Sequence, residues 1–328
     1  MKLWRHIKEH LQRYPTQVIC EGNAELTFED TLIFAERFSK RLNGVKCCAI
    51  LCQSEMAAAI ALLSCFAAGT TALPLSFRYG ELQCKKILDA ISPDAVIVDL
   101  GSTLQVLRMS ESTYKKPSFT PALIMCTSGT TGTPKGVMLT EENVCTNLKD
   151  ITYYFEIDTS DSILISRSLY HCAVLTGEFL TALCKGVKIR FYSESFNPAL
   201  MLNLLAEHKI TVFCGTPTLL GMLARFNRNG SQYHLRHICI SGECLCKETG
   251  EKVAKAFPQA KIYHVYGLTE ACPRISYLPP YLFEEYPDCV GVPLKSVSIK
   301  VVTPDGKIAA PNEIGVLWVK GGNVMEGY

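Results

Sequence analysis

The sequence predicts an α/β protein with two mainly parallel α/β subdomains and a small β-barrel-like module. Three observations lead to this fold class. Short apolar runs alternate with helix-like stretches through the first hundred residues, the same alternation resumes after a turn-rich loop, and short strands separated by turns follow Gly291. A chain of 328 residues is long enough for two or three packed subdomains.

The first subdomain begins with an expected amphipathic helix in MKLWRHIKEHLQRY. Leu3, Trp4, Ile7 and Leu11 fall on one face of this helix and charged residues fall on the other, which is unlike a signal peptide. The alternation that follows is typical of a parallel sheet with crossover helices. The expected strands are 18–20, 47–52, 71–75 and 95–100, the expected helices are 27–42, 55–68 and 79–90, and the polar stretch 101–120 is expected to be a connection.

The second subdomain is predicted from a further set of alternating elements. Two apolar strands flank the turn-rich loop, and Thr140 followed by Glu141 and Glu142 predicts the start of a helix. We expect subdomains at roughly 1–165 and 166–275 and a β-rich module at 276–328. The expected strands are 122–128, 135–140, 162–170, 187–192, 211–216, 237–242 and 261–267, and the expected helices are 176–184, 198–208, one near Leu219, and 247–257.

Composition and charge exclude several function classes. The formal net charge is +2 and no long Lys/Arg block occurs, so neither nucleic acid nor an anionic membrane is an expected partner. The longest apolar run, Met56 to Ala68, is too short to cross a bilayer. We therefore expect a cytoplasmic protein.

The 16 cysteines are spread through apolar segments of a chain too large to need disulfides, so free thiols are expected. Cys239, Cys244 and Cys246 form the tightest cluster. They contain no CxxC pair and have no histidine at zinc-finger spacing. Cysteine spacing therefore predicts no metal held by cysteine.

The stretch CTSGTTGTPKG, from Cys126 to Gly136, gathers glycines and hydroxyl side chains around one lysine. Glycine permits close approach of a ligand to the backbone, and the hydroxyls and Lys135 can donate to phosphate oxygens. The stretch is not a Walker loop, because Pro134 stands where a glycine is needed and Gly136 follows the lysine. It predicts a phosphate-binding loop between two strands, with a flexible hairpin loop as the alternative.

TSGTTGTPKG closely resembles the phosphate-binding signature of the adenylate-forming enzymes, a superfamily of acyl-CoA and aryl-CoA synthetases, nonribosomal peptide synthetase adenylation domains and luciferases. The resemblance extends over essentially the whole chain and implies that family's fold. The other segments that resemble family motifs, in the family's order, are LTFEDT (26–31), AAGTTALPLS (67–76), SLYHCAVLTGEF (168–179), ISGECL (240–245), VYGLTEA (265–271), VGVPL (290–294) and the closing GVLWVKGGNVMEGY.

The resemblance implies an AMP-forming acid–thiol ligase. In this family a carboxylate attacks the α-phosphate of ATP, pyrophosphate leaves, and the acyl-adenylate is passed to a thiol. Because the reacting groups are anionic, the chemistry depends on positioning and charge neutralisation. The implied cofactors are ATP and Mg²⁺, and the implied thiol is coenzyme A or the phosphopantetheine of an acyl or peptidyl carrier protein.

The resemblance also assigns roles to residues. Lys135 and the loop before it would hold the β- and γ-phosphates, Tyr266 would stack on adenine, Thr269 would bond the α-phosphate, and Glu270 would help hold Mg²⁺. His171 would lie between the carboxylate and ATP. Lys135, His171, Thr269 and Glu270 are thus the candidate catalytic residues, with Glu270 the metal ligand. The implied nucleotide-binding set is Thr127, Ser128, Gly129, Thr130, Thr131, Gly132, Lys135, Ser241, Gly242, Glu243, Tyr266, Gly267 and Thr269.

The class of carboxylic acid substrate is predicted from the residues that follow His171. Amino-acid-activating relatives place an Asp there for the α-ammonium, and the spacing to Glu178 and Gly186 puts that position at Ala173. An unpaired buried ammonium costs on the order of several kcal/mol, so an aryl or acyl acid is expected instead of an α-amino acid. Core packing of Ala173 is the alternative. The candidate substrate-binding residues are His171, Cys172, Ala173, Val174, Gly215, Thr216 and Gly267.

The family's chain continues beyond Tyr328. It carries a Tyr-x-x-Gly-Asp segment whose Asp binds ribose, a hinge, and a small C-terminal lobe with a lysine that contacts the reacting groups. The expectation here is the N-terminal lobe alone, cut before the hinge and in need of the small lobe for full activity. A non-catalytic nucleotide- or acyl-adenylate-binding protein and an amino-acid-activating adenylation domain remain alternatives.

Overall fold

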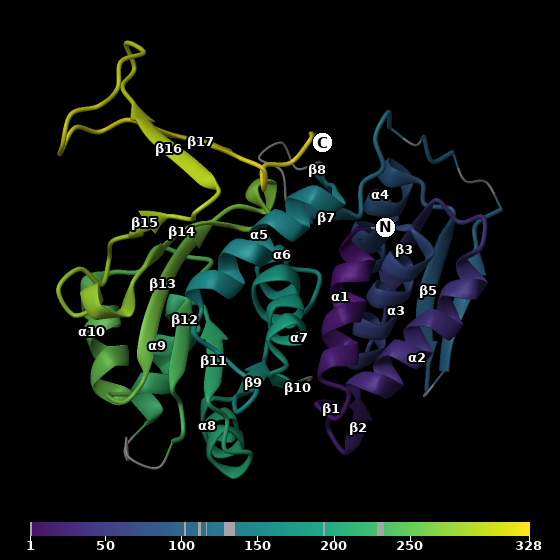
Figure 1. The fold of residues 1–328 in the computed structure, drawn as a ribbon, viewed down its shortest axis with the longest axis horizontal. Helices are drawn as coiled ribbons and strands as arrows, with labels where there is room; N and C mark the ends of the chain where they lie inside the picture. The colour runs from purple at the N-terminus through teal and green to yellow at the C-terminus, as the bar shows by residue number, and fades with distance from the viewer. Residues whose placement is uncertain are drawn as a thin grey trace.

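Two large β-sheets and the helices around them form the molecule (Figure 1). The computed structural model describes residues 2–101, 103–110, 113–115, 117–127, 135–192, 194–227 and 233–328. The predicted fold class, α/β with two mainly parallel sheets and a small β unit, is confirmed. The small unit is a two-stranded antiparallel sheet of β16 (Val297–Val302) and β17 (Val316–Gly321), which projects from the upper left of Figure 1.

The larger sheet has nine strands among the described residues. The pairings from β13 to β1 are parallel, and the remaining pairings toward both edges are antiparallel. From edge to edge its strands are β15 (Val292–Pro293), β14 (Arg274–Leu278), β13 (Lys261–Gly267), β12 (His237–Ile240), β11 (Val212–Gly215), β9 (Ser162–Ile165), β10 (Lys188–Phe191), β1 (Val18–Glu21) and β2 (Ala24–Thr27).

The second sheet has six strands among the described residues, with parallel pairing in the middle and antiparallel pairing at each edge. Its strands in spatial order are β6 (Thr103–Arg108), β5 (Ala95–Leu100), β3 (Cys47–Leu51), β4 (Thr71–Pro74), β7 (Leu123–Thr127) and β8 (Lys135–Leu139).

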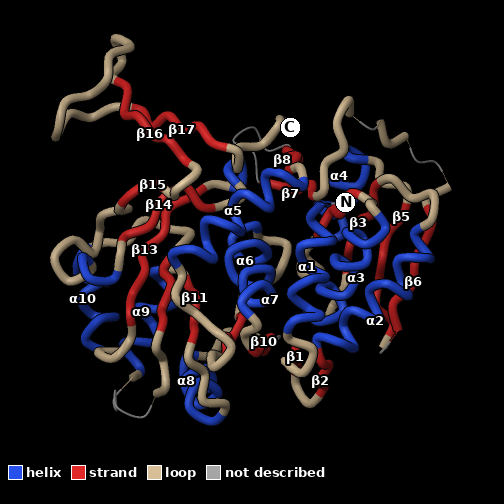
Figure 2. The backbone as a smooth tube through the Cα atoms, in the orientation of Figure 1, coloured by secondary structure: helices blue, strands red, loops and turns tan. Residues whose placement is uncertain are grey.

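The helices fill the space between the sheets and cover their outer faces (Figure 2). Short 3-10 or π turns join several of them. The α-helices are α1 (Lys2–Arg13), α2 (Phe28–Ser39), α3 (Glu55–Ala68), α4 (Glu81–Ile91), α5 (Glu141–Tyr154), α6 (Cys172–Val174), α7 (Thr181–Lys185), α8 (Pro198–Glu207), α9 (Pro217–Phe226) and α10 (Lys247–Ala256). The other helical turns are Lys40–Leu42, the π-helical Leu175–Leu180, Thr269–Ala271 and Pro280–Leu282.

Alternating side chains explain why both sheets are buried on two faces. In β9, Ile163 and Ile165 belong to the core between the two sheets, whereas Leu164 belongs to the core under α8, α9 and α10. In β3, Cys48 faces the core between the sheets and Ala49 faces the core under α4. Successive residues of a strand point to opposite faces, so strands that are apolar on both faces require helices on both sides.

The helix starts follow from capping side chains. The side chains of Thr27 and Thr140 each accept a hydrogen bond from the backbone N–H three residues later. In return, the backbone N–H of each threonine donates to the side chain of that later residue, Asp30 or Asn143. This reciprocal arrangement satisfies donors that the first helical turn leaves free. The predicted helix start at Thr140 is confirmed, as is the N-terminal helix, whose Leu3 is fully buried with the other apolar residues of its face.

The structure differs from the expected elements in several places. The strand expected at 162–170 ends at Ile165, and β2 at Ala24–Thr27 was not among the expected strands. The stretch 101–120 was expected to be a connection, but it contains β6, which pairs antiparallel with β5. The expected helix 176–184 is divided into a π-helical turn, Leu175–Leu180, followed by α7. The two sheets interleave along the chain, because β1 and β2 belong to the nine-stranded sheet although they precede the strands of the six-stranded one. The subdomain boundaries stay predictions.

Two expectations about the whole chain can be compared with the described residues. Each of the 16 cysteines is a free thiol, which confirms that reading of the sequence. No helix within the described ranges is long and apolar enough to cross a bilayer.

Candidate active site

The predicted motifs meet at one edge of the nine-stranded sheet. Strands β9, β11, β12 and β13 lie side by side and run parallel (Figure 1), with Gly215 paired to Ile240 and Ile240 paired to His264. Their carboxyl ends therefore share an edge, and Thr216, Ser241 and Tyr266–Gly267 lie at or just after the ends of three neighbouring strands. In open α/β sheets, ligands bind outside the carboxyl ends of the strands.

The two ends of the predicted phosphate-binding loop lie in β7 and β8, at one edge of the six-stranded sheet. Thr127 is the last residue of β7 and pairs with Lys135, the first residue of β8, so the two ends of the loop are adjacent. The predicted residues Ser128, Gly129, Thr130, Thr131 and Gly132 lie outside the described residues. Lys135 is exposed, so its ammonium is available to a ligand.

Tyr328 brings Lys135 and Glu270 together. The Lys135 Nζ lies 4.8 Å from the centre of the Tyr328 ring, and the Tyr328 hydroxyl donates a 3.0 Å hydrogen bond to Glu270 Oε1. This bond raises the pKa of the exposed Tyr328 hydroxyl, because the acceptor is a carboxylate. The residue predicted to hold phosphates and the residue predicted to hold Mg²⁺ therefore share one neighbour.

The closing segment of the chain is fixed by backbone contacts to both motifs. Met138 N–H of β8 donates to Gly327 O at 2.9 Å, and Met325 N–H donates to Glu270 O at 2.8 Å. The fully buried Asn323 donates from Nδ2 to Ala271 O at 2.8 Å. Sequence reasoning did not assign Asn323 or Tyr328 to the site, although both belong to the closing segment whose resemblance to the family had been noted.

Gly267 lets the chain turn sharply before Thr269 and Glu270. A Cβ at Gly267 would lie 1.9 Å from Pro273 O, closer than any real side chain allows. The β13–β14 register shifts between Tyr266 and Gly267, and Leu268 N–H donates to Pro273 O at 2.8 Å. Only glycine fits this close approach. The turn places Thr269 and Glu270 in a short 3-10 helix at the sheet edge.

In the ISGECL segment, residues 240–245, one predicted ligand-binding side chain contacts α9. Glu243 Oε2 accepts hydrogen bonds from Thr218 N–H and, at 2.6 Å, from Thr218 Oγ1. This carboxylate thus already binds the first turn of α9. Gly242 lies between Glu243 and the buried Ser241; it is exposed and has a φ of +96°. Gly242 leaves the backbone of this loop open to a ligand, while Glu243 holds the loop against α9.

His171 stands at the start of α6. Its ring lies 3.9 Å from the ring of Tyr170, centre to centre, and its backbone C=O accepts from the first helical turn. Although the side chain is exposed, desolvation by the surrounding chain lowers the pKa of His171, and the positive charge of Arg167 lowers it further. At pH 7 the ring is therefore neutral and can accept a hydrogen bond from a ligand.

The residues after His171 divide between core and surface. Cys172 and Val174 are buried in the core between the sheets, and Ala173 is half-buried. Gly215 is buried at the end of β11, and Thr216 caps α9 by accepting from Leu219 N–H. Of the three residues after His171, Ala173 is the most accessible.

A buried ion pair that the sequence did not predict links the segment around His171 to the loop at Ser241. Arg167 Nη2 lies 2.5 Å from Glu178 Oε1 and 3.4 Å from Ser241 Oγ. Glu178 is 1% exposed; burial raises the pKa of its carboxyl, and Arg167 opposes that rise. Arg167 follows β9 and Glu178 lies in the π-helical turn, so the pair ties the His171 segment to the end of β12. The sequence predicted no role for Arg167, and Glu178 was used only to count the spacing to Ala173.

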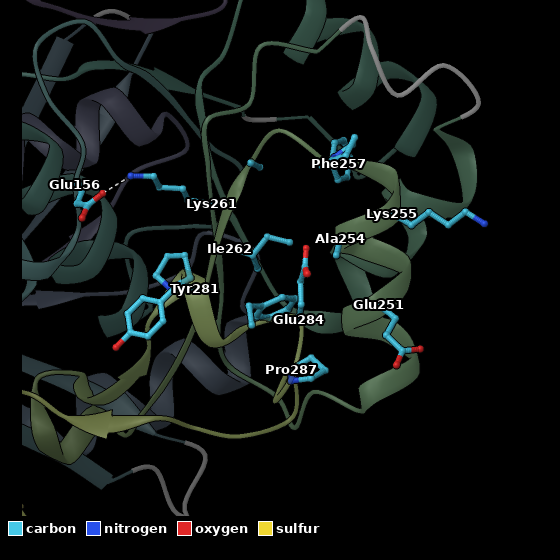
Figure 3. Close-up of a pocket in the computed structure, with 14 residues that line it drawn as sticks. Glu156, Glu251, Ala254, Lys255, Phe257, Lys261, Ile262, Tyr281, Glu284 and Pro287 are labelled. Carbon is cyan, nitrogen blue, oxygen red and sulfur yellow. Dashed lines mark hydrogen bonds and ion pairs between the residues drawn. The ribbon is translucent and has the colours of Figure 1, made fainter.

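A groove of about 640 Å³ lies away from these loops (Figure 3). It is lined by α10, the Pro280–Leu282 turn and the first residues of β13, and an ion pair of 2.5 Å joins Lys261 to Glu156 at its wall. Lys261 is at the amino end of β13, whereas Tyr266 and Gly267 are at its carboxyl end. The groove contains none of the predicted site residues.

Comparisons with known proteins agree with the motifs. A family model described as AMP-binding enzyme matches residues 7–328. A feruloyl-CoA synthase of an Amycolatopsis species is 28% identical over 291 residues, which are 81% of this chain and 58% of the relative. The 2-succinylbenzoate–CoA ligase of Bacillus subtilis (strain 168) is 28% identical over 342 residues, 92% of this chain and 67% of the relative.

A solved structure shares the fold. The N-terminal domain of FACL13 from Mycobacterium tuberculosis superposes with a TM-score of 0.84 at 17% identity, covering 99% of this chain and 90% of that domain. At this identity the likeness shows the fold alone. The chain spans 58% of the length of the feruloyl-CoA synthase, less than two thirds. The family match over residues 7–328, together with the motif order and the fold, shows that the chain belongs to the AMP-binding, or adenylate-forming, enzyme superfamily.

Proposed function

We propose that this chain forms an acyl-adenylate from ATP and a carboxylic acid, releasing pyrophosphate, for transfer to the thiol of coenzyme A or of a carrier protein. The observation that carries the proposal is the meeting of Lys135, Glu270 and Tyr328 beside the edge where the ends of β9, β11, β12 and β13 converge. Family membership supplies the reaction class, and this arrangement supplies the residues for it.

The nucleotide side of the proposal depends on charge. Lys135 would pair with the β- and γ-phosphates, and the Thr269 hydroxyl would donate to the α-phosphate. The Glu270 carboxylate fits Mg²⁺, which favours one or two carboxylates together with phosphate oxygens and water. When bound, Mg²⁺ would neutralise charge on the departing pyrophosphate. Binding requires Glu270 and Lys135 to exchange their contacts with Tyr328 for contacts with the ligand.

The acid side of the proposal depends on the uncharged side chain at Ala173, where amino-acid-activating relatives place an Asp. The neutral His171 ring can orient a carboxylate-bearing ligand at the sheet edge, and the backbone at Gly215 and Thr216 can line the other wall. An α-ammonium at Ala173 would be desolvated without a carboxylate partner, so an aryl or acyl acid is favoured. The two relatives are named feruloyl-CoA synthase and 2-succinylbenzoate–CoA ligase, names that join CoA to an aromatic acid, which supports this choice.

The test is a single-turnover assay for acyl-adenylate and pyrophosphate with ATP, Mg²⁺ and a panel of aryl, fatty and α-amino acids. Pyrophosphate release with aryl or fatty acids, and none with α-amino acids, is the expected result. A preference for an α-amino acid would contradict the proposed acid class. Tight AMP or ATP binding with no adenylate from any acid, including after addition of a relative's small C-terminal lobe, would favour the binding-protein alternative.

A further inference from the structure

A cluster of metal-binding side chains lies outside the motifs. His6 and His10 are one turn apart on α1, and Cys184 on α7 faces them, so that one ligand atom from each lies within 4.8 Å of the others. Cys184 Sγ is 3.8 Å from His6 Nε2, and the two imidazole rings meet edge to face with 4.8 Å between centres. Helices α1 and α7 lie side by side in Figure 1 and pack against each other.

The donor atoms suit a borderline-soft divalent metal. Two imidazole nitrogens and one thiolate match the N/S sets that bind Zn²⁺ tetrahedrally, with a fourth position for water. Ligand atoms around such an ion are about 3.3–3.8 Å apart, so the His6–Cys184 spacing already fits and the widest gap must close by about 1 Å. Rotation of the two half-exposed histidine side chains can supply that change.

One imidazole nitrogen of the cluster's histidines has no partner in the protein. His10 Nδ1 is buried and has no hydrogen-bond partner, although buried polar atoms in native proteins usually have one. Cys184 is 4% exposed, and its thiol contacts His6. A metal ion bound through Nδ1 would satisfy the His10 nitrogen that the surrounding chain leaves without a partner.

The charges and space around the cluster favour Zn²⁺ over a hard cation. The cavity of about 1010 Å³ around the cluster has more cationic than anionic side chains in its lining. Those that oppose a dication are Lys2, Arg5, Arg13, Lys149, Lys185 and Lys295, and those that favour it are Glu9, Glu142 and Asp150. Only a metal that gains strongly from imidazole and thiolate donors would overcome the opposing charge, which excludes Mg²⁺. The cavity leaves room for the fourth, water ligand.

We propose that His6, His10 and Cys184 bind Zn²⁺ and thereby clamp α1 onto α7. On binding, the Cys184 thiol loses its proton to solvent as the sulfur–zinc bond forms, so one proton is released for each ion bound. This site differs from the expectation based on cysteine spacing, because its ligands come from two helices and are separated by 178 residues. The site is independent of the proposed adenylation chemistry.

The experiment measures Zn²⁺ and Co²⁺ binding by the full chain in excess Mg²⁺, which competes at carboxylate sites such as the proposed one at Glu270. The exposed thiols Cys244, Cys246 and Cys289 are first changed to Ser to remove competing sites. We expect one equivalent of metal, a thiolate-to-cobalt charge-transfer absorption, and a higher Tm with Zn²⁺. Cys184→Ser should abolish the charge-transfer absorption while keeping the side chain's size.

Two further variants separate the site from general metal binding. His10→Ala should weaken Zn²⁺ binding by about a hundredfold, since loss of even an indirect ligand contact weakens metal sites by about tenfold to a hundredfold. His234→Ala, which removes an exposed histidine elsewhere, should leave the affinity unchanged. If circular dichroism shows that His10→Ala does not fold, His6→Asn provides a second test. Unchanged affinity in the folded histidine variants, or cobalt binding without the thiolate absorption, would overturn the proposal.

Discussion

The Tyr328 hydroxyl donates a 3.0 Å hydrogen bond to Glu270, while the Lys135 ammonium lies over the same ring. The hydrogen bond joins residues 58 positions apart, and together with Lys135 it links the end of the predicted phosphate-binding loop to the YGLTE turn. In the free protein, Tyr328 is the neighbour of both groups that are proposed to meet the triphosphate and its metal. Nucleotide binding must therefore replace contacts that already exist, which makes several of its consequences measurable.

Lys135→Ala should weaken ATP binding more than AMP binding. The lysine is proposed to contact the β- and γ-phosphates, which AMP lacks, and a charge-assisted hydrogen bond contributes about 1.5–3 kcal/mol, or roughly tenfold to a hundredfold in affinity. Calorimetry with both nucleotides provides the measurement. Lys252→Ala, which removes an exposed lysine from α10, is the matched control. Equal losses for ATP and AMP would remove Lys135 from the terminal phosphates.

Glu270→Gln should weaken the magnesium dependence of ATP binding and leave metal-free AMP binding nearly unchanged, because the substitution keeps size and removes charge. Tyr328→Phe is the informative contrast. It removes the hydroxyl that donates to Glu270 but keeps the ring beside Lys135, so magnesium-dependent binding should be equal or stronger. Titrations of ATP at several Mg²⁺ concentrations measure both effects. Loss of ATP and AMP binding alike in Glu270→Gln would make Glu270 a structural residue.

Gly267→Ala should strongly destabilise the fold and disturb nucleotide binding. The new Cβ would lie 1.9 Å from Pro273 O, so the β13–β14 turn must open, at a cost of about 3 kcal/mol or more. Gly221→Ala, in α9, is the control, because a Cβ there would make an ordinary 3.4 Å contact with the Thr249 side chain of α10. The control should be neutral or stabilise by about 0.5–1 kcal/mol. Urea unfolding compares the two, and equal stability would contradict the geometry of the turn.

The pH dependence of stability should fall when His264 is replaced. Burial lowers the pKa of His264, and the backbone at Cys289 and Pro287 and the charge of Asp288 only partly oppose this. The folded chain therefore keeps the ring neutral while the unfolded chain takes up a proton near pH 6.5. Its contribution to stability is complete above that pH and is lost as the pH falls below it.

The comparison that isolates this effect uses urea unfolding at about pH 7.5 and about pH 5.5. Wild type should lose more stability between these values than His264→Gln does. His234→Gln, at an exposed position, should keep the wild-type difference. An identical loss in wild type and His264→Gln would show that the buried ring is not the titrating group.

The sequence was sufficient for features with local signals. The strict alternation of apolar runs and amphipathic stretches predicted α3, α8 and α10 within a residue or two, and the capping pattern at Thr140 located the start of α5. The β6 strand was missed because the stretch around it is polar, although the half-buried Leu104 and Val106 alternate with the exposed Thr103, Gln105 and Leu107. A period of two in a polar stretch is the signal that could have found it.

The remaining features depend on contacts between distant segments. β1 and β2 pair with each other, but no local pattern shows that β1 also pairs with β10, more than 160 residues away, and so joins the nine-stranded sheet. The Arg167–Glu178 pair and the Tyr328–Glu270 bond are likewise tertiary, and their charged residues look like ordinary surface groups in the sequence. The motifs predicted which loops would matter, but not the side chains that hold those loops together.

The central claim is that the adenylate binds at the carboxyl edge of β9, β11, β12 and β13 and not in the groove at the amino end of β13. The most direct test is calorimetric binding of a nonhydrolysable aryl-adenylate analogue, an aroyl-sulfamoyl adenosine, to Thr269→Val and to Tyr281→Ala, which lines the groove of Figure 3. The account predicts that Thr269→Val lowers the affinity by about tenfold, the value of one lost hydrogen bond to a charged group, and that Tyr281→Ala changes nothing. Unchanged affinity in Thr269→Val together with weakened binding in Tyr281→Ala would contradict it.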